Sequence, residues 1–133
     1  MLAGEAATIN GDGRYIRDYV YGPDVARANV IALTGTIQEV RPKTLTSLNI
    51  GSGIGTDVNQ LEAMVRQSIA EYWNATGTAA PLPAPLHGPA RAGDLRSNLL
   101  DATLASSVLG WKPTVSLASG VAQTVAWFAQ HLQ

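Results

Sequence analysis

GDGRYIRDYVY, at residues 11–21, is the stretch from which the fold of this chain can be argued. Its two glycines can adopt positive φ and an extended run follows them, so the sequence predicts a hairpin, with strands at 7–9 and 14–21 joined by a turn at 10–13. The second strand carries an arginine–aspartate pair, Arg17 and Asp18. Only 14% of the residues are charged, against about a quarter in an average soluble domain, so this pair indicates a specific role.

A second stretch, RAGDLR at residues 91–96, has a similar make-up. A guanidinium group presents paired donors in one plane, which suits a phosphate, and a neighbouring carboxylate can orient it. The two stretches are therefore candidates for one shared diphosphate site. On the residues alone the alternative is a pair of structural ion pairs, since exposed pairs are common and contribute little to stability.

Size and composition exclude several classes of protein. A chain of 133 residues predicts one domain, 1–133, with a modest core. The net charge of −1 and the lack of any Lys/Arg run argue against nucleic-acid binding. No apolar run reaches the roughly 18 residues that a membrane span needs. The absence of cysteine excludes disulfides and thiolate metal sites, and we expect a cytoplasmic protein.

The residues after the second predicted strand indicate a helix and a further strand. Pro23 ends the extended run, and Asp24 is expected to cap a helix through Leu33. This helix is apolar nearly all round, which predicts that it is covered on more than one side. A short buried strand is expected at Leu45–Ile50.

The rest of the chain is predicted to be mostly helical. The glycine-rich segment 51–55 leads into an amphipathic helix that Thr56 caps and that ends near Trp73. Asp101 is expected to cap a short helix that Gly110 terminates, and Ser116 to begin the last helix. The other predicted elements are a surface connector at 76–89 and a strand at 95–99. The fold class is therefore α/β, a small mixed sheet with about four helices.

Catalytic and cofactor motifs are missing from the sequence. The glycines at 51–55 have G-x-G-x-G spacing, which favours a tight turn over a dinucleotide fingerprint. There is no Tyr-x-x-x-Lys, no G-x-S-x-G and no P-loop. Neither His87 nor His131 has a neighbour at metal-ligand spacing. We predict a binding surface with no catalytic residue, no cofactor-binding residue and no metal ligand.

Four ordered motifs resemble those of a known family: GDGxxxRDYVY at 11–21, NIGSG at 49–53, RxGD at 91–94 and LGWxP at 109–113. They are similar to motifs of the extended short-chain dehydrogenase/reductases. The nearest resemblance is to the C-terminal, sugar-nucleotide-binding portion of UDP-glucose 4-epimerases and related NAD-dependent epimerases and dehydratases. The resemblance covers almost the whole chain.

The resemblance implies roles for individual residues. Arg17 matches an arginine that contacts the diphosphate of the bound sugar nucleotide, and Arg91 matches the second arginine of that contact. Asp94 matches a residue near the nucleotide ribose. Asp18 is expected to orient Arg17. The implied ligand is a UDP- or dTDP-sugar.

The chain also departs from the family pattern. Family members carry an NAD-binding glycine loop and a catalytic Tyr-x-x-x-Lys in a cofactor-binding half, and neither is present here. Residues 1–5 themselves resemble the middle of a family member. The resemblance therefore implies a partial Rossmann-type fragment that lacks the cofactor-binding half. Asp24, Gly110 and Trp111 are assigned to capping, turn and core.

Without the cofactor-binding half to cover them, apolar residues of the predicted 24–33 helix and of the 45–50 segment would be exposed. Each large side chain forfeits about 1.5–3 kcal/mol when it is left in water, so we expect self-association, with a dimer favoured. Three hypotheses follow: a free-standing binding module, a structural oligomer with a vestigial ligand site, or half of an epimerase completed by a separate cofactor-domain chain.

Overall fold

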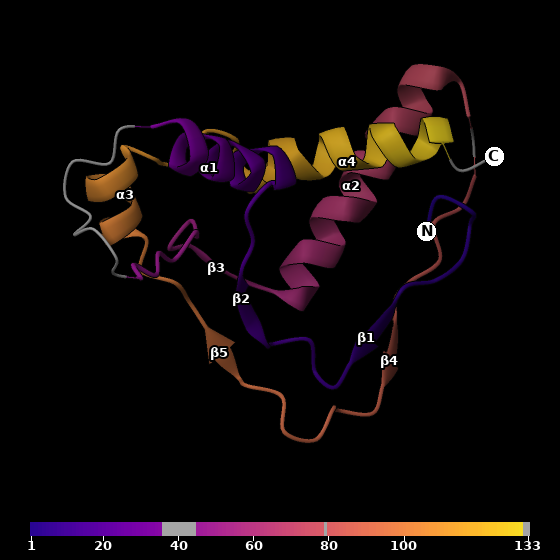
Figure 1. The fold of residues 1–133 in the computed structure, drawn as a ribbon. Helices are drawn as coiled ribbons and strands as arrows, with labels where there is room; N and C mark the ends of the chain where they lie inside the picture. Colours follow the sequence, from indigo (N-terminus) through magenta and orange to yellow (C-terminus); the bar gives the residue numbers. More distant parts are fainter. Residues whose placement is uncertain (36–44, 79, 132–133) are drawn as a thin grey trace.

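Helices form one layer of the molecule, and short strands lie beneath them (Figure 1). The computed structural model describes residues 1–35, 45–78 and 80–131. Within these residues the elements are β1 (Thr8–Asn10), β2 (Ile16–Asp18), α1 (Gly22–Thr34), β3 (Gly55–Asp57), α2 (Val58–Thr76), β4 (Leu86–Gly88), β5 (Ser97–Asn98), α3 (Thr103–Leu109) and α4 (Leu117–His131). This is the α/β class with a small mixed sheet that the sequence predicts. None of the described helices combines the length and apolarity needed to cross a membrane.

The strands form two separate small sheets. β1 pairs in parallel with β4, Thr8 lying opposite Leu86. β2 is the central strand of the second sheet, antiparallel to β3 and parallel to β5, with Arg17 opposite Thr56 and Asn98. The predicted hairpin is therefore wrong, because β1 and β2 pair with strands from later in the chain and not with each other.

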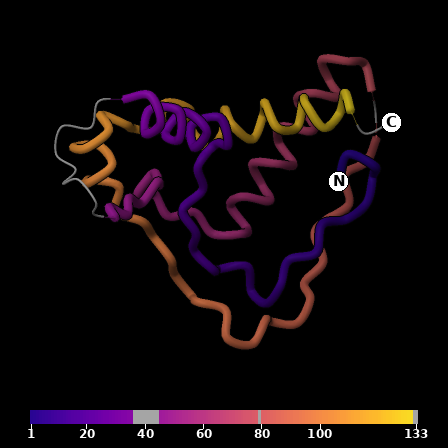
Figure 2. Tube along the Cα trace, viewed as in Figure 1, coloured from indigo at the N-terminus to yellow at the C-terminus, as the bar shows by residue number. Residues whose placement is uncertain are grey.

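The predicted turn between these strands is nevertheless present. Gly11 and Gly13 have φ of +66° and +70°, which an L side chain rarely adopts. The amide of Gly11 donates to the carbonyl of Gly88 at 3.0 Å, so the chain leaves β1 still bound to the end of β4. The connections 11–15 and 89–96 then run together to the lower edge of the molecule (Figure 2).

The main hydrophobic core lies between α2 and α4. Its buried members are Ile69 and Trp73 from α2 and Val121 and Val125 from α4. The amphipathic spacing in the two predicted helices accounts for these contacts. Phe128, also on α4, is 43% exposed.

The N-terminus of α2 differs from its prediction by one residue. Asp57 is the N-cap: its Oδ1 accepts from the amide of Gln60 at 2.7 Å, and the Gln60 side chain accepts from the amide of Asp57 at 3.0 Å. This reciprocal capping box satisfies two helix-end donors. Thr56, the predicted cap, lies buried in β3.

A second core is built around Trp111, whose side chain is fully buried against Ala28 of α1 and Ala105 of α3. Gly110, at φ +63°, ends α3 as predicted. The expected strand at 45–50 is absent, and Leu45 is 94% exposed. Leu48 and Ile50 pack against the Trp111 core from an irregular segment.

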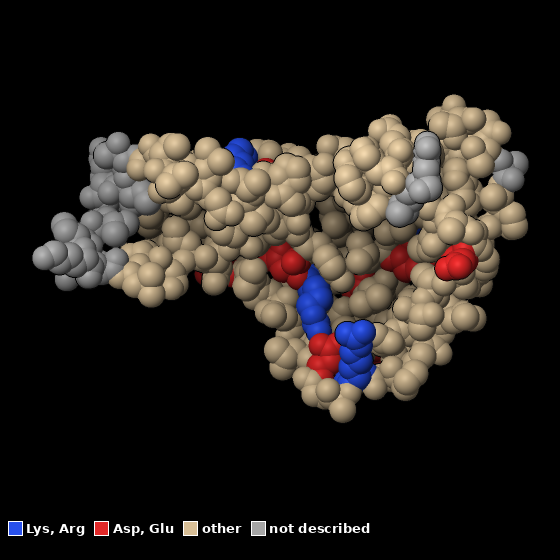
Figure 3. Space-filling model, turned by 45° about the vertical axis from the view of Figure 1, so that its right-hand side comes forward, with Lys and Arg blue, Asp and Glu red and all other residues tan. Residues whose placement is uncertain are grey.

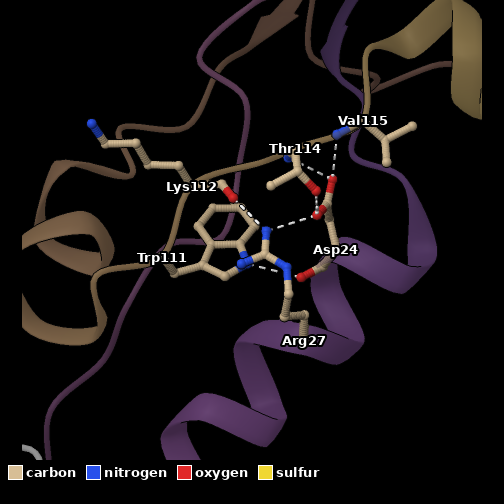
Figure 4. A network of polar contacts seen from close by, with 6 residues as sticks. All are labelled: Asp24, Arg27, Trp111, Lys112, Thr114 and Val115. Atoms are coloured by element: carbon tan, nitrogen blue, oxygen red, sulfur yellow. Dashed lines mark hydrogen bonds and ion pairs between the residues drawn. The ribbon is translucent and has the colours of Figure 1, made fainter.

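Asp24 joins α1 to the segment after Trp111 (Figure 4). Its carboxylate accepts from the amides of Thr114 and Val115, both at 2.9 Å, and from the Thr114 hydroxyl at 2.7 Å. Arg27 donates to the same carboxylate at 2.8 Å, and Trp111 Nε1 to the Asp24 carbonyl at 2.9 Å. The capping role predicted for Asp24 is wrong, because α1 already begins at Gly22 and the carboxylate serves a distant loop.

The apolar surface of α1 is only partly covered within the chain. Val25 is 36%, Val30 57% and Leu33 86% exposed. Ile31 packs against the Trp111 core, but Asp24 and Ala28 are the only buried residues of this helix. The sequence predicts that this helix is packed against other elements on more than one side, but the described residues do not bury it to that extent.

The Asp24 network predicts a pH-dependent contribution to stability. Burial raises the pKa of Asp24, but hydrogen bonds from Arg27, Thr114 and Val115 outweigh it and hold the pKa below its ordinary range. A carboxyl whose folded pKa is lowered stabilises the fold above its unfolded pKa of about 3.9, and the stabilisation is lost as the pH falls further. Asp24→Asn should cost about 1–3 kcal/mol at neutral pH.

Urea unfolding of both proteins between pH 7 and pH 3 measures this effect. The difference between wild type and variant should narrow below about pH 4, where Asp24 of the unfolded chain becomes protonated. The matched control is Glu5→Gln, the same charge removal at an exposed carboxyl near the N-terminus. Equal unfolding free energies for wild type and Asp24→Asn at pH 7 would contradict the assignment.

Candidate functional site

Arg17 lies at the centre of the mixed sheet and is 27% exposed at its side chain. The guanidinium donates to the carbonyls of Ile16 at 2.8 Å and Leu95 at 2.7 Å, and forms an ion pair with Asp94. Two carbonyl acceptors on one nitrogen fix the plane of the guanidinium group. Parallel pairing of β2 and β5 is what brings the 91–96 stretch beside Arg17.

Asp94 and Arg91 lie in one tight turn. The amide of Asp94 donates to the carbonyl of Arg91 at 3.3 Å, and Gly93 between them has φ of +79°. Arg91 is exposed. The structure thus joins Arg17 and Asp94 directly and sets Arg91 three residues away in the same turn, without a described contact between the two arginines.

Asp18 does not orient Arg17, contrary to expectation. Its carboxylate accepts from the amide of Ser52 at 2.8 Å, the Ser52 hydroxyl at 2.6 Å and the amide of Gly53 at 2.8 Å. Burial raises the pKa of Asp18, but the bonds from Ser52, Gly53 and Leu100 prevail and lower it. Asp18 therefore holds the glycine loop against β2.

This contact decides what the glycine loop can bind. Phosphate cradles use free amide groups, but the amides of Ser52 and Gly53 already donate to Asp18. A Cβ at Gly51 would lie 2.7 Å from the Asp18 carboxylate and 2.6 Å from Leu100, so glycine is needed there for packing. The loop is a packed turn, as its spacing indicates.

A second ion pair, between Asp12 and Arg96, was not expected from the sequence. The guanidinium nitrogens of Arg96 donate to the two Asp12 oxygens at 2.8 Å each, and the group lies 5.0 Å from the Tyr15 ring. The hydrogen bonds from Arg96 lower the pKa of Asp12 to about 2. Both residues belong to the two arginine-rich stretches, and that shared composition was the available signal.

Two ion pairs, Arg17–Asp94 and Arg96–Asp12, join charged side chains of the two stretches. Figure 3 shows basic and acidic side chains next to one another in a column that descends to the lower edge of the molecule. Two described cavities, of about 620 and 200 Å³, flank the glycine loop and share Ser52 and Pro113. Neither is lined by Arg17, Arg91 or Asp94.

The histidines make local contacts. His87 Nδ1 lies 2.7 Å from the carbonyl of Gly11, and His131 Nδ1 lies 2.7 Å from that of Trp127, so each Nδ1 carries the hydrogen. Among the residues that the structure describes, no group of three or more His, Cys, Asp or Glu side chains is placed to hold a metal ion.

Comparison with known proteins gives a consistent result. The family model described as GDP-mannose 4,6 dehydratase matches residues 1–124. The UDP-glucose 4-epimerase of Mycolicibacterium smegmatis is 38% identical over 133 residues, which are the whole of this chain and 37% of that protein.

Solved structures of similar proteins also match. The crystal structure of UDP-glucose 4-epimerase with UDP-glucose from Thermotoga maritima is 42% identical and superposes with a TM-score of 0.77, over 100% of this chain and 38% of that one. MoeE5 in complex with UDP-glucose and NAD is 35% identical, with a TM-score of 0.75, over 99% of this chain and 39% of that one.

This chain therefore spans little more than a third of the length of these relatives. The match to the family model over nearly the whole chain and the order of the four motifs agree with each other. The chain belongs to the GDP-mannose 4,6-dehydratase family, and within the extended short-chain dehydrogenase/reductases it is similar to the UDP-glucose 4-epimerases, as its motifs predict.

Proposed function

We propose that this chain binds the diphosphate of a UDP- or dTDP-sugar through Arg17 and Arg91, with Asp94 near the ribose. The observation that carries the proposal is the placement of Arg17 beside the 91–94 turn by the pairing of β2 with β5. Two arginines on adjoining segments offer two planar forks to one diphosphate. A relative that covers the whole of this chain was solved with UDP-glucose.

The hydrogen bonds of Arg17 leave capacity for a ligand. An arginine has five N–H donors, and the described residues engage three of them, through Ile16, Leu95 and Asp94. The carbonyl contacts hold the group in place, while the ion pair with Asp94 lies at the partly exposed side. A phosphate oxygen would take the remaining donors and compete with Asp94 for a third.

No redox step is assigned to the chain. NAD accompanies UDP-glucose in the MoeE5 structure, and an NAD diphosphate needs free backbone amides at a glycine loop. Here the amides of Ser52 and Gly53 donate to Asp18, so the loop does not fit that group. The proposed function is therefore binding, and NAD chemistry would need residues outside this chain.

Nucleotide binding tests the proposal directly. Titration calorimetry at low ionic strength should detect UDP, UDP-glucose or dTDP, and Arg91→Ala should weaken the binding by about tenfold or more, since it removes a charge-assisted contact. The affinity should fall as salt is added. Arg91 is exposed, so its loss leaves the fold intact.

Arg14→Ala is the matched control, because Arg14 is also an exposed arginine but its described contact to Asp12 uses the backbone amide alone. It should leave the affinity nearly unchanged. Absence of heat with every nucleotide, or an equal affinity in Arg91→Ala, would sink the binding proposal. The vestigial-site hypothesis, in which the arginines serve only as ion pairs, would then hold.

A second proposal concerns partners. We propose that the exposed face of α1, with Val30 and Leu33 as its most exposed apolar residues, is covered by another chain: a second copy in a homodimer, or a separate cofactor-domain chain. The support is energetic, because large apolar side chains left in water forfeit about 1.5–3 kcal/mol each. Val30 and Leu33 are three positions apart and so lie on the same side of the helix, and exposed apolar patches mark protein interfaces.

Sedimentation tests the dimer. The wild-type chain should sediment as a dimer at micromolar concentration, and Leu33→Lys should shift it to a monomer without unfolding, since Leu33 is 86% exposed. The control is Leu86→Lys, at a leucine that is 60% exposed on β4, away from α1. A stable wild-type monomer would contradict the dimer and leave the separate chain as the remaining partner.

A further inference from the structure

The 11–13 turn contacts both ends of the loop that carries Arg91 and Asp94. At the start of the loop, the amide of Gly11 donates to Gly88 at 3.0 Å, and a Cβ at Gly11 would lie 3.2 Å from Ala90. At its end, two guanidinium nitrogens of Arg96 donate to the Asp12 carboxylate, each at 2.8 Å. The loop between them is thus closed across the turn.

The turn is itself seated firmly on the first residues of α2. The side-chain amide of Asn59 donates to the Asp12 carbonyl at 2.9 Å, and its backbone amide donates to the Gly13 carbonyl at 3.2 Å. A Cβ at Gly13 would lie 2.2 Å from the Asn59 side chain. These contacts fix the position of the turn relative to α2 independently of its ion pair with Arg96.

The same contacts set the position of Arg17. The amide of Ile16, its neighbour in β2, donates to the carbonyl of Arg96 at 2.9 Å. Arg96 therefore contacts β2 through its backbone and the turn through its side chain. The separation between Arg17 and the 91–94 turn thus depends on these two contacts of Arg96 as well as on the direct contacts of Arg17 with Leu95 and Asp94.

The Asp12–Arg96 ion pair contributes little to overall stability, because its two side chains are 51% and 57% exposed. Its bidentate geometry and the Tyr15 ring beneath the guanidinium group instead restrict the direction of approach. We infer that this Asp12–Arg96 clamp is a positioning device that sets the spacing of Arg17 and Arg91 for a diphosphate, an inference that rests on the proposed function.

Arg96→Lys tests the inference, since lysine keeps the charge but lacks the planar fork. The readout is the ratio of the affinities for UDP and UMP, measured by calorimetry. If the clamp spaces two arginines for two phosphates, its loss in Arg96→Lys should lower this ratio by about five- to tenfold. Damage to the fold would weaken the binding of UDP and of UMP by the same factor. Asp12→Asn, which keeps the acceptor for the Arg14 amide, should act in the same direction.

Arg14→Lys is the matched control, the same exchange at an exposed arginine close to Asp12. It should leave the ratio unchanged, and all variants should keep the thermal midpoint of the wild type. An unchanged UDP-to-UMP ratio in both Arg96→Lys and Asp12→Asn, with UDP bound by the wild type, overturns the clamp but not the proposed function.

Amide hydrogen exchange tests the clamp independently of the proposed nucleotide binding, because the measurement needs no nucleotide. In Arg96→Lys the amides of Asp94 and Ile16 should exchange faster, because their acceptors lie in the released loop, while the amide of Ile69 in the α2–α4 core keeps its protection. Equal exchange at Asp94 in wild type and variant overturns the clamp. If the wild type binds neither nucleotide, the proposed function fails, and the exchange rates alone decide whether the clamp orders the loop.

Discussion

The carboxylate of Asp24 is the contact on which the arrangement of the helices depends. A buried carboxylate is tolerated only when donors surround it, and here Thr114, Val115 and Arg27 supply them. The network ties the first turn of α1 to the segment that leads from Trp111 into α4. Because α4 packs on α2, and the capped start of α2 supports the 11–13 turn, the position of the arginines follows from this one buried charge through a short series of contacts.

A second aspartate has the same physical role for a different segment. The Asp18 carboxylate accepts hydrogen bonds from the amides of Ser52 and Gly53 and so holds the glycine loop against β2. In both cases a carboxylate takes the place of water as the hydrogen-bond acceptor for backbone amides of a distant loop. The charged groups that face solvent, Arg17, Arg91 and Asp94, are a separate set. Because two carboxylates order the loops and a different set of charged groups faces solvent, a chain with few charges can have both ordered loops and a polar surface.

Periodicity predicted the helices of this fold well, because their apolar spacing and their terminating glycines are local properties. The stripe containing Val121 and Val125 and the left-handed Gly110 are examples. Strand pairing is non-local, and there the predictions were wrong: the 45–50 segment, expected to be a strand, is irregular, and the strands around the 10–13 turn belong to two different sheets. The pairing of Arg17 with Asp94 and of Arg96 with Asp12 joins residues more than seventy positions apart, which no spacing rule could assign.

The ion pair between Arg17 and Asp94 has a consequence for discrimination among anions. In the free protein this arginine already has a negative partner, so chloride or any singly charged ion would exchange one ion pair for another and gain little. A pyrophosphate group carries more charge than a carboxylate and can reach a second cation at the same time. Under the proposed function, the Asp94 carboxylate would therefore compete with singly charged anions for Arg17, and a multiply charged ligand would be favoured over them.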